Sequence, residues 1–330
     1  MKKDKKVTNS NSIFTLKNII IVICLIIGYF ILTFLAEGDF LSRQSKSLIV
    51  PMGINIILAV SLSLTVGFLG ELSLGHAGFM AIGGYTGALI TLHMDLPKGL
   101  EFTLALIAGG IMAAIFGFLI GLPVLRLKGD YLAIVTLAFG EIIRSVLTSL
   151  KITGGAQGLT KIPRYSNYTW VYIVMILTVV LISNFVKSRH GRAIISVREN
   201  YIAAESIGIK VSKYKVMAFV IAAFFAGVAG VFYGHNLSIL KPGDFDYNKS
   251  IEILVIVVLG GMGNIKGSII AAIALTFLPE MLRSVDEFRT LLYAVVLIAM
   301  MLFRSSGFRT KLEESGKLPK FMKPNMKRAK

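Results

Sequence analysis

One stretch of this otherwise apolar chain gathers titratable side chains among glycines. It covers residues 67–78 and contains Glu71, Ser73 and His76, with Tyr85 shortly after it. Charged and titratable groups are costly at membrane depth unless they have partners, so they are typical of a transport path or of a buried pair. We therefore treat these four side chains as candidates for contact with a polar solute.

A second glycine-rich stretch, at residues 260–268, lies in the other half of the chain. Its candidate residues are three of its four glycines and an amide: Gly260, Gly261, Gly263 and Asn264. Two glycine-interrupted segments in corresponding halves are typical of transporters with an internal repeat. A broken helix leaves backbone groups unpaired, and lipid cannot satisfy them, so these groups must contact protein or water. Alternatively, the glycines only allow helices to pack closely.

A third stretch, residues 187–215, is basic and amphipathic, and it separates two apolar runs. Residues 198–207 are expected to form about two and a half helical turns, with Val197, Tyr201, Ala204 and Ile207 near one face. Such a helix suits a groove on a separate soluble protein. The alternative is a membrane-surface helix whose basic residues bind anionic lipid head groups.

Composition indicates a membrane protein. The chain is 55% hydrophobic and 16% charged, with a mean hydropathy of +0.75. Its apolar runs of about 18 residues or more are long enough to cross a hydrocarbon core of roughly 30 Å. The net charge of +17 is concentrated in the tails and loops, which favours the positive-inside pattern over nucleic-acid binding. The single Cys24 excludes a disulfide framework and a cysteine metal site within the chain.

The expected fold is an all-α integral membrane protein with about ten transmembrane helices, in the range of eight to ten. The predicted spans are 19–36, 48–69, 75–93, 102–122, 130–150, 169–186, 214–234, the apolar run 250–283 divided at its glycines, and 288–303. The piece 250–262 is short for a full span and is expected to be tilted or re-entrant.

Basic residues set the expected orientation. A basic N-terminus (1–18), the segment 187–213 and a basic tail (304–330) are predicted to be cytoplasmic, and a transmembrane domain occupies 19–303. Both termini lie inside only if the run 250–283 crosses twice. Within the spans, Glu141 and Arg144 are three residues apart and are expected to neutralise each other, as are Glu280 and Arg283.

Enzyme motifs are nearly absent, so we do not expect an enzyme. Residues 263–268 superficially resemble a phosphate-binding loop, but the lysine precedes the glycine instead of following it. The four histidines are scattered along the chain. Uphill transport would therefore need an ion gradient or a partner protein as its source of energy.

Several long stretches, in order, carry a family resemblance. The chain resembles the LivM-type permease subunit of branched-chain amino-acid ABC importers, which is related to urea and amide permeases. The matching stretches are GFLGELSLGHAGFMAIGGYTGAL at 67–89, LRLKGDYLAIVTLAFGEIIRSV at 125–146, TGGAQGL at 153–159, GRAIISVRENYIAAESIGIKVSKYKVMAFVIAAFFAGVAGVFYG at 191–234 and VVLGGMGNIKGSIIAAI at 257–273.

The resemblance implies a multi-pass subunit of the bacterial cytoplasmic membrane. Its partners would be a second homologous permease subunit, two ABC ATPase subunits that bind the ATP, an extracytoplasmic substrate-binding protein and membrane lipid. Neither a cofactor in this chain nor nucleic acid is implied. Leu, Ile and Val are the implied substrates; urea or another small polar solute, or an ion-coupled secondary transporter, are the alternatives.

The resemblance also assigns roles to residues. The segment 187–213 corresponds to the part that couples the permease to its ATPases, with six residues as candidates: Arg198, Glu199, Ala203, Ala204, Glu205 and Gly208. The two glycine-rich stretches would border the path of a zwitterionic amino acid. Backbone N–H groups at a helix start would suit its carboxylate, and Glu71 would face its ammonium group or pair with Arg144 or another buried cation.

Overall fold

The computed structural model describes residues 28–30, 33–34, 43–94, 96–125, 127, 129–282, 294–295 and 298. The chain divides into two units, Met1–Ile49 and Val50–Lys330. In the first unit the structure describes α2 (Arg43–Ser47). The basic tails lie outside the described residues, as does most of the spans predicted at 19–36 and 288–303.

The described part of the chain is helical, and its one β-type contact is a bridge between Leu159 and Leu240. The all-α membrane fold is therefore confirmed, while the count of ten crossings stays a prediction. Among the described residues, five segments are long and apolar enough to span a membrane: Ser45–Leu69, Lys98–Val124, Asp130–Ser149, Tyr168–Lys187 and Val211–Leu237.

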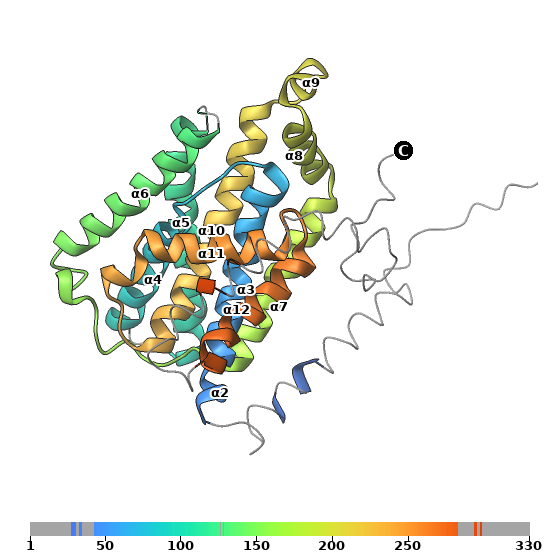
Figure 1. The fold of residues 1–330 in the computed structure, drawn as a ribbon. Helices are drawn as coiled ribbons and strands as arrows, with labels where there is room; N and C mark the ends of the chain where they lie inside the picture. The colour runs from blue at the N-terminus through green and yellow to red at the C-terminus, as the bar shows by residue number, and fades with distance from the viewer. Residues whose placement is uncertain are drawn as a thin grey trace, which may run out of the picture. The chain divides into compact units, whose positions relative to one another are not determined.

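The helices of the second unit follow the predicted order (Figure 1). They are α3 (Ile49–Leu62), the π-helix η1 (Ser63–Leu69), α4 (His76–His93), α5 (Lys98–Val124), α6 (Asp130–Ser149), the 3₁₀ turn η2 (Gly155–Gln157), α7 (Tyr168–Lys187), α8 (Arg189–Glu199), α9 (Tyr201–Ser206), α10 (Val211–Leu237), the 3₁₀ turn η3 (Pro242–Phe245), α11 (Tyr247–Gly260) and α12 (Ile265–Met281).

Small residues hold α10 against α4 and α5 at the centre of this unit (Figure 1). A Cβ atom on Gly83 of α4 would lie 2.3 Å from the Cα of Gly227 in α10, and one on Gly230 would lie 1.9 Å from the carbonyl oxygen of Met80. Lipid provides no hydrophobic drive between helices, so such backbone contact supplies the packing energy. Larger side chains at these points would separate the three helices.

The run 250–283 is divided as predicted. Helix α11 ends at Gly260, α12 begins at Ile265, and the two pack against each other. A Cβ atom on Gly267 would lie 1.8 Å from the carbonyl oxygen of Gly260, so glycine allows the hairpin to close. Figure 1 shows α11 crossing the direction of α10. Whether α11 is tilted or re-entrant in the membrane stays a prediction.

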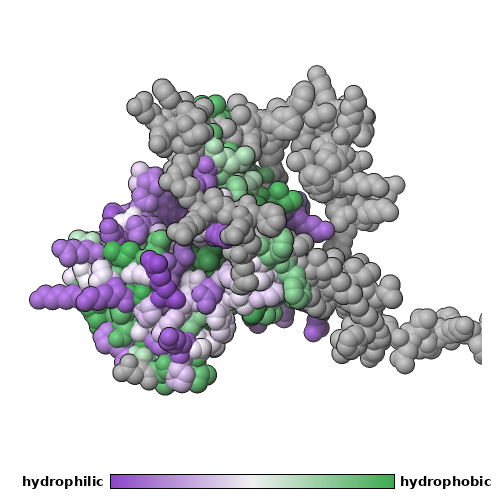
Figure 2. Space-filling model, turned by 90° about the horizontal axis from the view of Figure 1, so that it is seen from below, coloured by the Kyte–Doolittle hydropathy of each residue, from purple (hydrophilic) through white to green (hydrophobic). Residues whose placement is uncertain are grey.

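Helices α8 and α9 occupy one end of the second unit, and the connection between α6 and α7 runs along the opposite end (Figure 1). Figure 2 looks onto this opposite end and shows hydrophilic side chains gathered there among hydrophobic ones. There the Tyr165 hydroxyl donates to a Glu101 carboxylate oxygen at 3.3 Å. Partial burial, followed by the negative charge of Glu101, raises the pKa of Tyr165, so its hydroxyl stays protonated at neutral pH.

Candidate functional site

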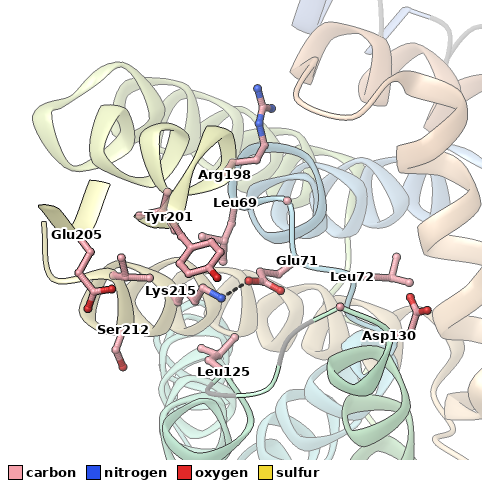
Figure 3. A pocket seen from close by; sticks show the side chains of 14 residues that line it. Leu69, Glu71, Leu72, Leu125, Asp130, Arg198, Tyr201, Glu205, Ser212 and Lys215 are labelled. Atoms are coloured by element: carbon pink, nitrogen blue, oxygen red, sulfur yellow. Dashed lines mark hydrogen bonds and ion pairs between the residues drawn. The ribbon is translucent and has the colours of Figure 1, made fainter. Parts of the chain in front are cut away.

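A cavity of about 590 Å³ lies where α8 and α9 meet the starts of α6 and α10. Its lining comes from five parts of the chain: the η1–α4 connection, the α5–α6 connection, α8, α9 and the first turns of α10. Figure 3 shows Tyr201 of α9 beside the paired Glu71 and Lys215. The cavity therefore joins the first glycine-rich stretch to the amphipathic segment, which sequence reasoning had treated as separate sites.

Glu71 and Lys215 form an ion pair in the wall of this cavity. Their side chains are only 16% and 10% exposed. Sequence reasoning left the partner of Glu71 open between a substrate, Arg144 and another buried cation, and the cation is Lys215. Lys215 stands in the first turns of α10, so the pair ties the extended chain after η1 to that helix.

Arg198 lies at the edge of the cavity, and its guanidinium group points away from the Glu71–Lys215 pair (Figure 3). Its Nη1 donates to the carbonyl oxygen of Gly67 at 2.8 Å, and its other nitrogens bind Glu199. A Cβ atom on Gly263 would lie 3.3 Å from the same Nη1. One arginine of α8 thus contacts the end of η1 and stands beside the α11–α12 turn.

The single helix expected over 198–207 is wrong, because the chain turns a corner at Asn200. Helix α8 ends at Glu199, and α9 starts at Tyr201. Asn200 is extended, with φ −158°, and its Oδ1 accepts hydrogen bonds from the N–H groups of Ile202 and Ala203, both at 3.1 Å. An asparagine side chain that caps the next helix in this way stabilises a break over a continuous helix.

The corner also changes which side chains are exposed. Ala204 is 2% exposed and packs with Val197 against η1 and α10. The outward surface is instead Ile202, 64% exposed, Ala203, and Ile207, 75% exposed; we call these three residues the α9 tip. Sequence reasoning missed Ile202, because a continuous helix would have placed it away from the apolar face. Glu205 lines the cavity, and Gly208 follows α9 with φ +86°.

The remaining polar candidates of the first stretch are buried away from the cavity. His76 Nε2 lies 2.9 Å from Ser61 Oγ, and the Tyr85 hydroxyl donates to the carbonyl oxygen of Leu240 at 3.0 Å. Ser73 is 3% exposed. The structure therefore does not gather these three with Glu71, and their contact with a solute stays a prediction.

The unpaired backbone groups of the first break are satisfied by distant side chains. Thr136 Oγ1 accepts from the Leu74 N–H at 3.0 Å, and Ser250 Oγ accepts from the Ala77 N–H at 3.1 Å. Both backbone N–H groups therefore have the hydrogen-bond partners that backbone at membrane depth requires. No sequence pattern indicated Thr136 or Ser250, because one hydroxyl among apolar residues does not reveal which helix it faces.

The second break is a tight turn with its own cap. Gly261 and Gly263 have φ of +101° and +78°, a region that favours glycine. Asn264 Oδ1 accepts from the Gly267 N–H at 3.2 Å and so caps α12. A Cβ atom on Gly260 would lie 2.4 Å from the Cα of Ser268. These contacts explain all four residues structurally, and a role in the path stays a prediction.

A comparison with known protein families identifies the family to which this chain belongs. A family model described as "Branched-chain amino acid transport system / permease component" matches residues 45–304, which include both breaks, the cavity and the α8–α9 segment. The chain belongs to this permease family. It is a family of transport proteins, which agrees with the absence of enzyme motifs. Among the described residues, no group of three or more His, Cys, Asp or Glu side chains is arranged to hold a metal ion.

Relatives of this permease come from bacteria and archaea. The high-affinity branched-chain amino acid transport system permease protein LivM of Escherichia coli is 38% identical over 81% of this chain and 70% of its own length. The probable LivM of Methanocaldococcus jannaschii is 26% identical over 65% of this chain and 74% of its length. LivH of Salmonella typhimurium is 24% identical over 76% of this chain and 89% of its length. No solved structure matches the chain.

Proposed function

We propose that this permease is one membrane subunit of an ABC importer that carries leucine, isoleucine or valine into the cytoplasm. The observation that carries the proposal is the α9 tip, an exposed apolar surface on a basic segment, which Arg198 joins to the end of η1. Family membership supports the reaction class, and the names of LivM and LivH support the substrate class.

In this account the chain binds no ATP. Two separate ATPase subunits bind the nucleotide, and a groove on one of them receives the α9 tip. Such a helix-in-groove contact suits Ile202 and Ile207, because both side chains are apolar and largely exposed. Basic residues of the same segment, Arg189, Arg192, Lys210 and Lys213 among them, would also lie near anionic lipid head groups.

Movement of the docked segment would reach the helix breaks through two contacts. Arg198 holds the carbonyl oxygen of Gly67 near the end of η1, and Lys215 holds Glu71 at the start of the connection that follows. Residues 72–75 lead from Glu71 into α4. A shift of α8 relative to α10 therefore pulls directly on the connection that leads into α4.

The complete importer would contain a second homologous permease subunit and an extracytoplasmic substrate-binding protein. The permease would lie in the bacterial cytoplasmic membrane, with α8, α9 and both termini in the cytoplasm. Transport of urea or another small polar solute would keep the same architecture with a different binding protein. An ion-coupled secondary transporter would not need an exposed apolar α9 tip.

Substitution at the α9 tip tests the proposal. Ile207→Arg and Ile202→Arg place a charge on exposed positions, so the bundle should still fold, while ATPase subunits should no longer co-purify and uptake should fall to background. The matched control is Leu127→Arg, which adds the same charge to a side chain 38% exposed in the α5–α6 connection. Ala204 is unsuitable because it is buried. Normal co-purification and uptake with both isoleucine variants would contradict the proposal.

A further inference from the structure

Glu141 and Arg144 form an ion pair in the interior of a membrane span. Glu141 lies eleven residues after the start of α6 at Asp130 and eight before its end at Ser149. At 1.5 Å per residue this is about 16 Å along the helix, near the middle of a hydrocarbon core of roughly 30 Å. The other four candidate spans carry their Lys, Arg, Asp and Glu residues within four positions of one end.

This pair is not enclosed by the described chain. The side chain of Arg144 is 41% exposed and that of Glu141 is 29% exposed. Exposed charges at this depth are costly against lipid and normally face a bundle interior or a watery cavity. Ala138 and Ser145, three residues before and four after Glu141, lie on the same side of α6 and are also exposed. The exposed side chains of α6 around the pair thus include small ones beside larger apolar ones, which are Ile134, Ile142 and Val146.

A second helix brings further polar groups to the same place. The backbone N–H of Tyr247, the first residue of α11, donates to Glu141 Oε1 at 3.1 Å. One turn along α11, Lys249 and Glu252 form another ion pair at 2.9 Å, with side chains 19% and 42% exposed. Asp246 caps the helix by accepting from the Lys249 N–H at 3.0 Å. Acidic and basic groups thus alternate around the start of α11.

We propose that Glu141 and Arg144 line a water-filled part of the transport path and bind the charged ends of the passing amino acid. Arg144 takes the carboxylate, and Glu141 takes the ammonium group. This inference rests on the proposed function for the substrate class. Arg144 Nε and Nη2 both lie 2.7 Å from Glu141 Oε2, which leaves other guanidinium N–H groups for a second carboxylate.

The charges of the site are compensated both without and with substrate. Without substrate the two side chains neutralise each other, so the path holds no uncompensated charge at membrane depth. A zwitterion brings one charge of each sign and replaces the internal pair with two new pairs, and the net charge of the site stays the same. A solute of single charge leaves one partner uncompensated, so the site favours zwitterions over anions and cations.

Cysteine labelling tests whether this side of α6 faces water. In the assembled importer, with Cys24→Ser as background, Ala138→Cys and Ser145→Cys should react with a membrane-impermeant thiol reagent, and leucine-loaded binding protein with ATP should change their rates. The matched control is Ile111→Cys at the middle of α5, where the side chain is 48% exposed and should stay unreactive. Ala138→Cys and Ser145→Cys as unreactive as Ile111→Cys would overturn the proposal.

Charge substitution tests the binding role. Glu141→Gln and Arg144→Gln should each lower the maximal leucine uptake rate roughly tenfold or more, because each leaves one end of the zwitterion without its charged partner. Co-purification of the ATPases should remain normal in both variants. Undiminished uptake in both variants would overturn the binding role. If the Ala138→Cys variant is labelled but the wild-type importer carries no branched-chain amino acid, the proposed function would instead be refuted.

Discussion

The Arg198 guanidinium group donates a hydrogen bond of 2.8 Å to the carbonyl oxygen of Gly67, across 131 positions of sequence. Gly67 is two residues from the end of η1, where helix carbonyl groups lack partners inside the helix. A cation suits this end of the helix dipole. Gly70, with φ +80°, ends η1 beside the aliphatic part of Arg198, where a Cβ atom would lie 2.5 Å from Cγ. Arg198 is thus held to the end of η1 by a hydrogen bond and by packing, and we call this contact the α8–η1 joint.

Loss of this joint should uncouple ATP hydrolysis from transport. In Arg198→Ala the α9 tip is intact, so the ATPases should still bind, but uptake should fall roughly tenfold. ATP hydrolysis by the complex should respond less to loaded binding protein. Arg198→Lys keeps the charge without the guanidinium fork and should be intermediate. Arg189→Ala, at an exposed position at the start of α8, is the control. If ATP hydrolysis and uptake stay tightly coupled in Arg198→Ala, Arg198 does not transmit the movement.

The buried Glu71–Lys215 pair should dominate the stability of the connection after η1. Removing one partner leaves the other buried and unpaired, at a cost of about 3–5 kcal/mol. Glu71→Leu and Lys215→Met should each lower the melting temperature of the purified permease, and the double variant should recover much of the loss. The melting temperatures of all four proteins measure the coupling. Additive losses in the double variant would show that the two side chains do not depend on each other.

Sequence patterns predicted the fold better than the site, for physical reasons. Apolar runs and glycine breaks placed the ends of α5, α6, α7 and α10 within a few residues. The partner of Glu71 could not be predicted, because Lys215 looks like any basic residue at the start of a span. The corner at Asn200 was missed because amphipathic spacing continues across it, and only the cap bonds reveal the break. Long-range partners depend on tertiary contacts that local spacing does not encode.

The cap at Asn200 should be needed to present the α9 tip. Helix α9 has six residues, too few to be stable alone. Asn200→Ala removes both cap bonds and should cost about 1 kcal/mol. We expect faster hydrogen exchange in residues 201–206 and weaker binding of the ATPases. Asn200→Asp keeps the oxygen acceptor and should behave like the wild type. Equal exchange in the alanine and aspartate variants would show that the cap is dispensable.

Substitutions at Gly263 distinguish a role in forming the turn from a role in lining the transport path. Its φ of +78° is unfavourable for alanine, by about 1–2 kcal/mol, but asparagine tolerates it better. If the turn alone matters, Gly263→Asn should keep more thermal stability and more uptake than Gly263→Ala, although its side chain is larger. If Gly263 borders the path, the larger asparagine should block uptake more than alanine. Uptake and melting temperature, measured together on both variants, decide between the two roles.

The most direct test of the central claim is uptake of radiolabelled leucine by proteoliposomes that contain this permease with its partner permease, ATPase subunits and binding protein. The account predicts accumulation that requires ATP on the side of α8 and α9, persists when ion gradients are abolished, and is lost in Ile207→Arg. Accumulation driven by an ion gradient without ATP would contradict it. So would ATP-driven uptake of ribose or urea with no uptake of leucine, isoleucine or valine.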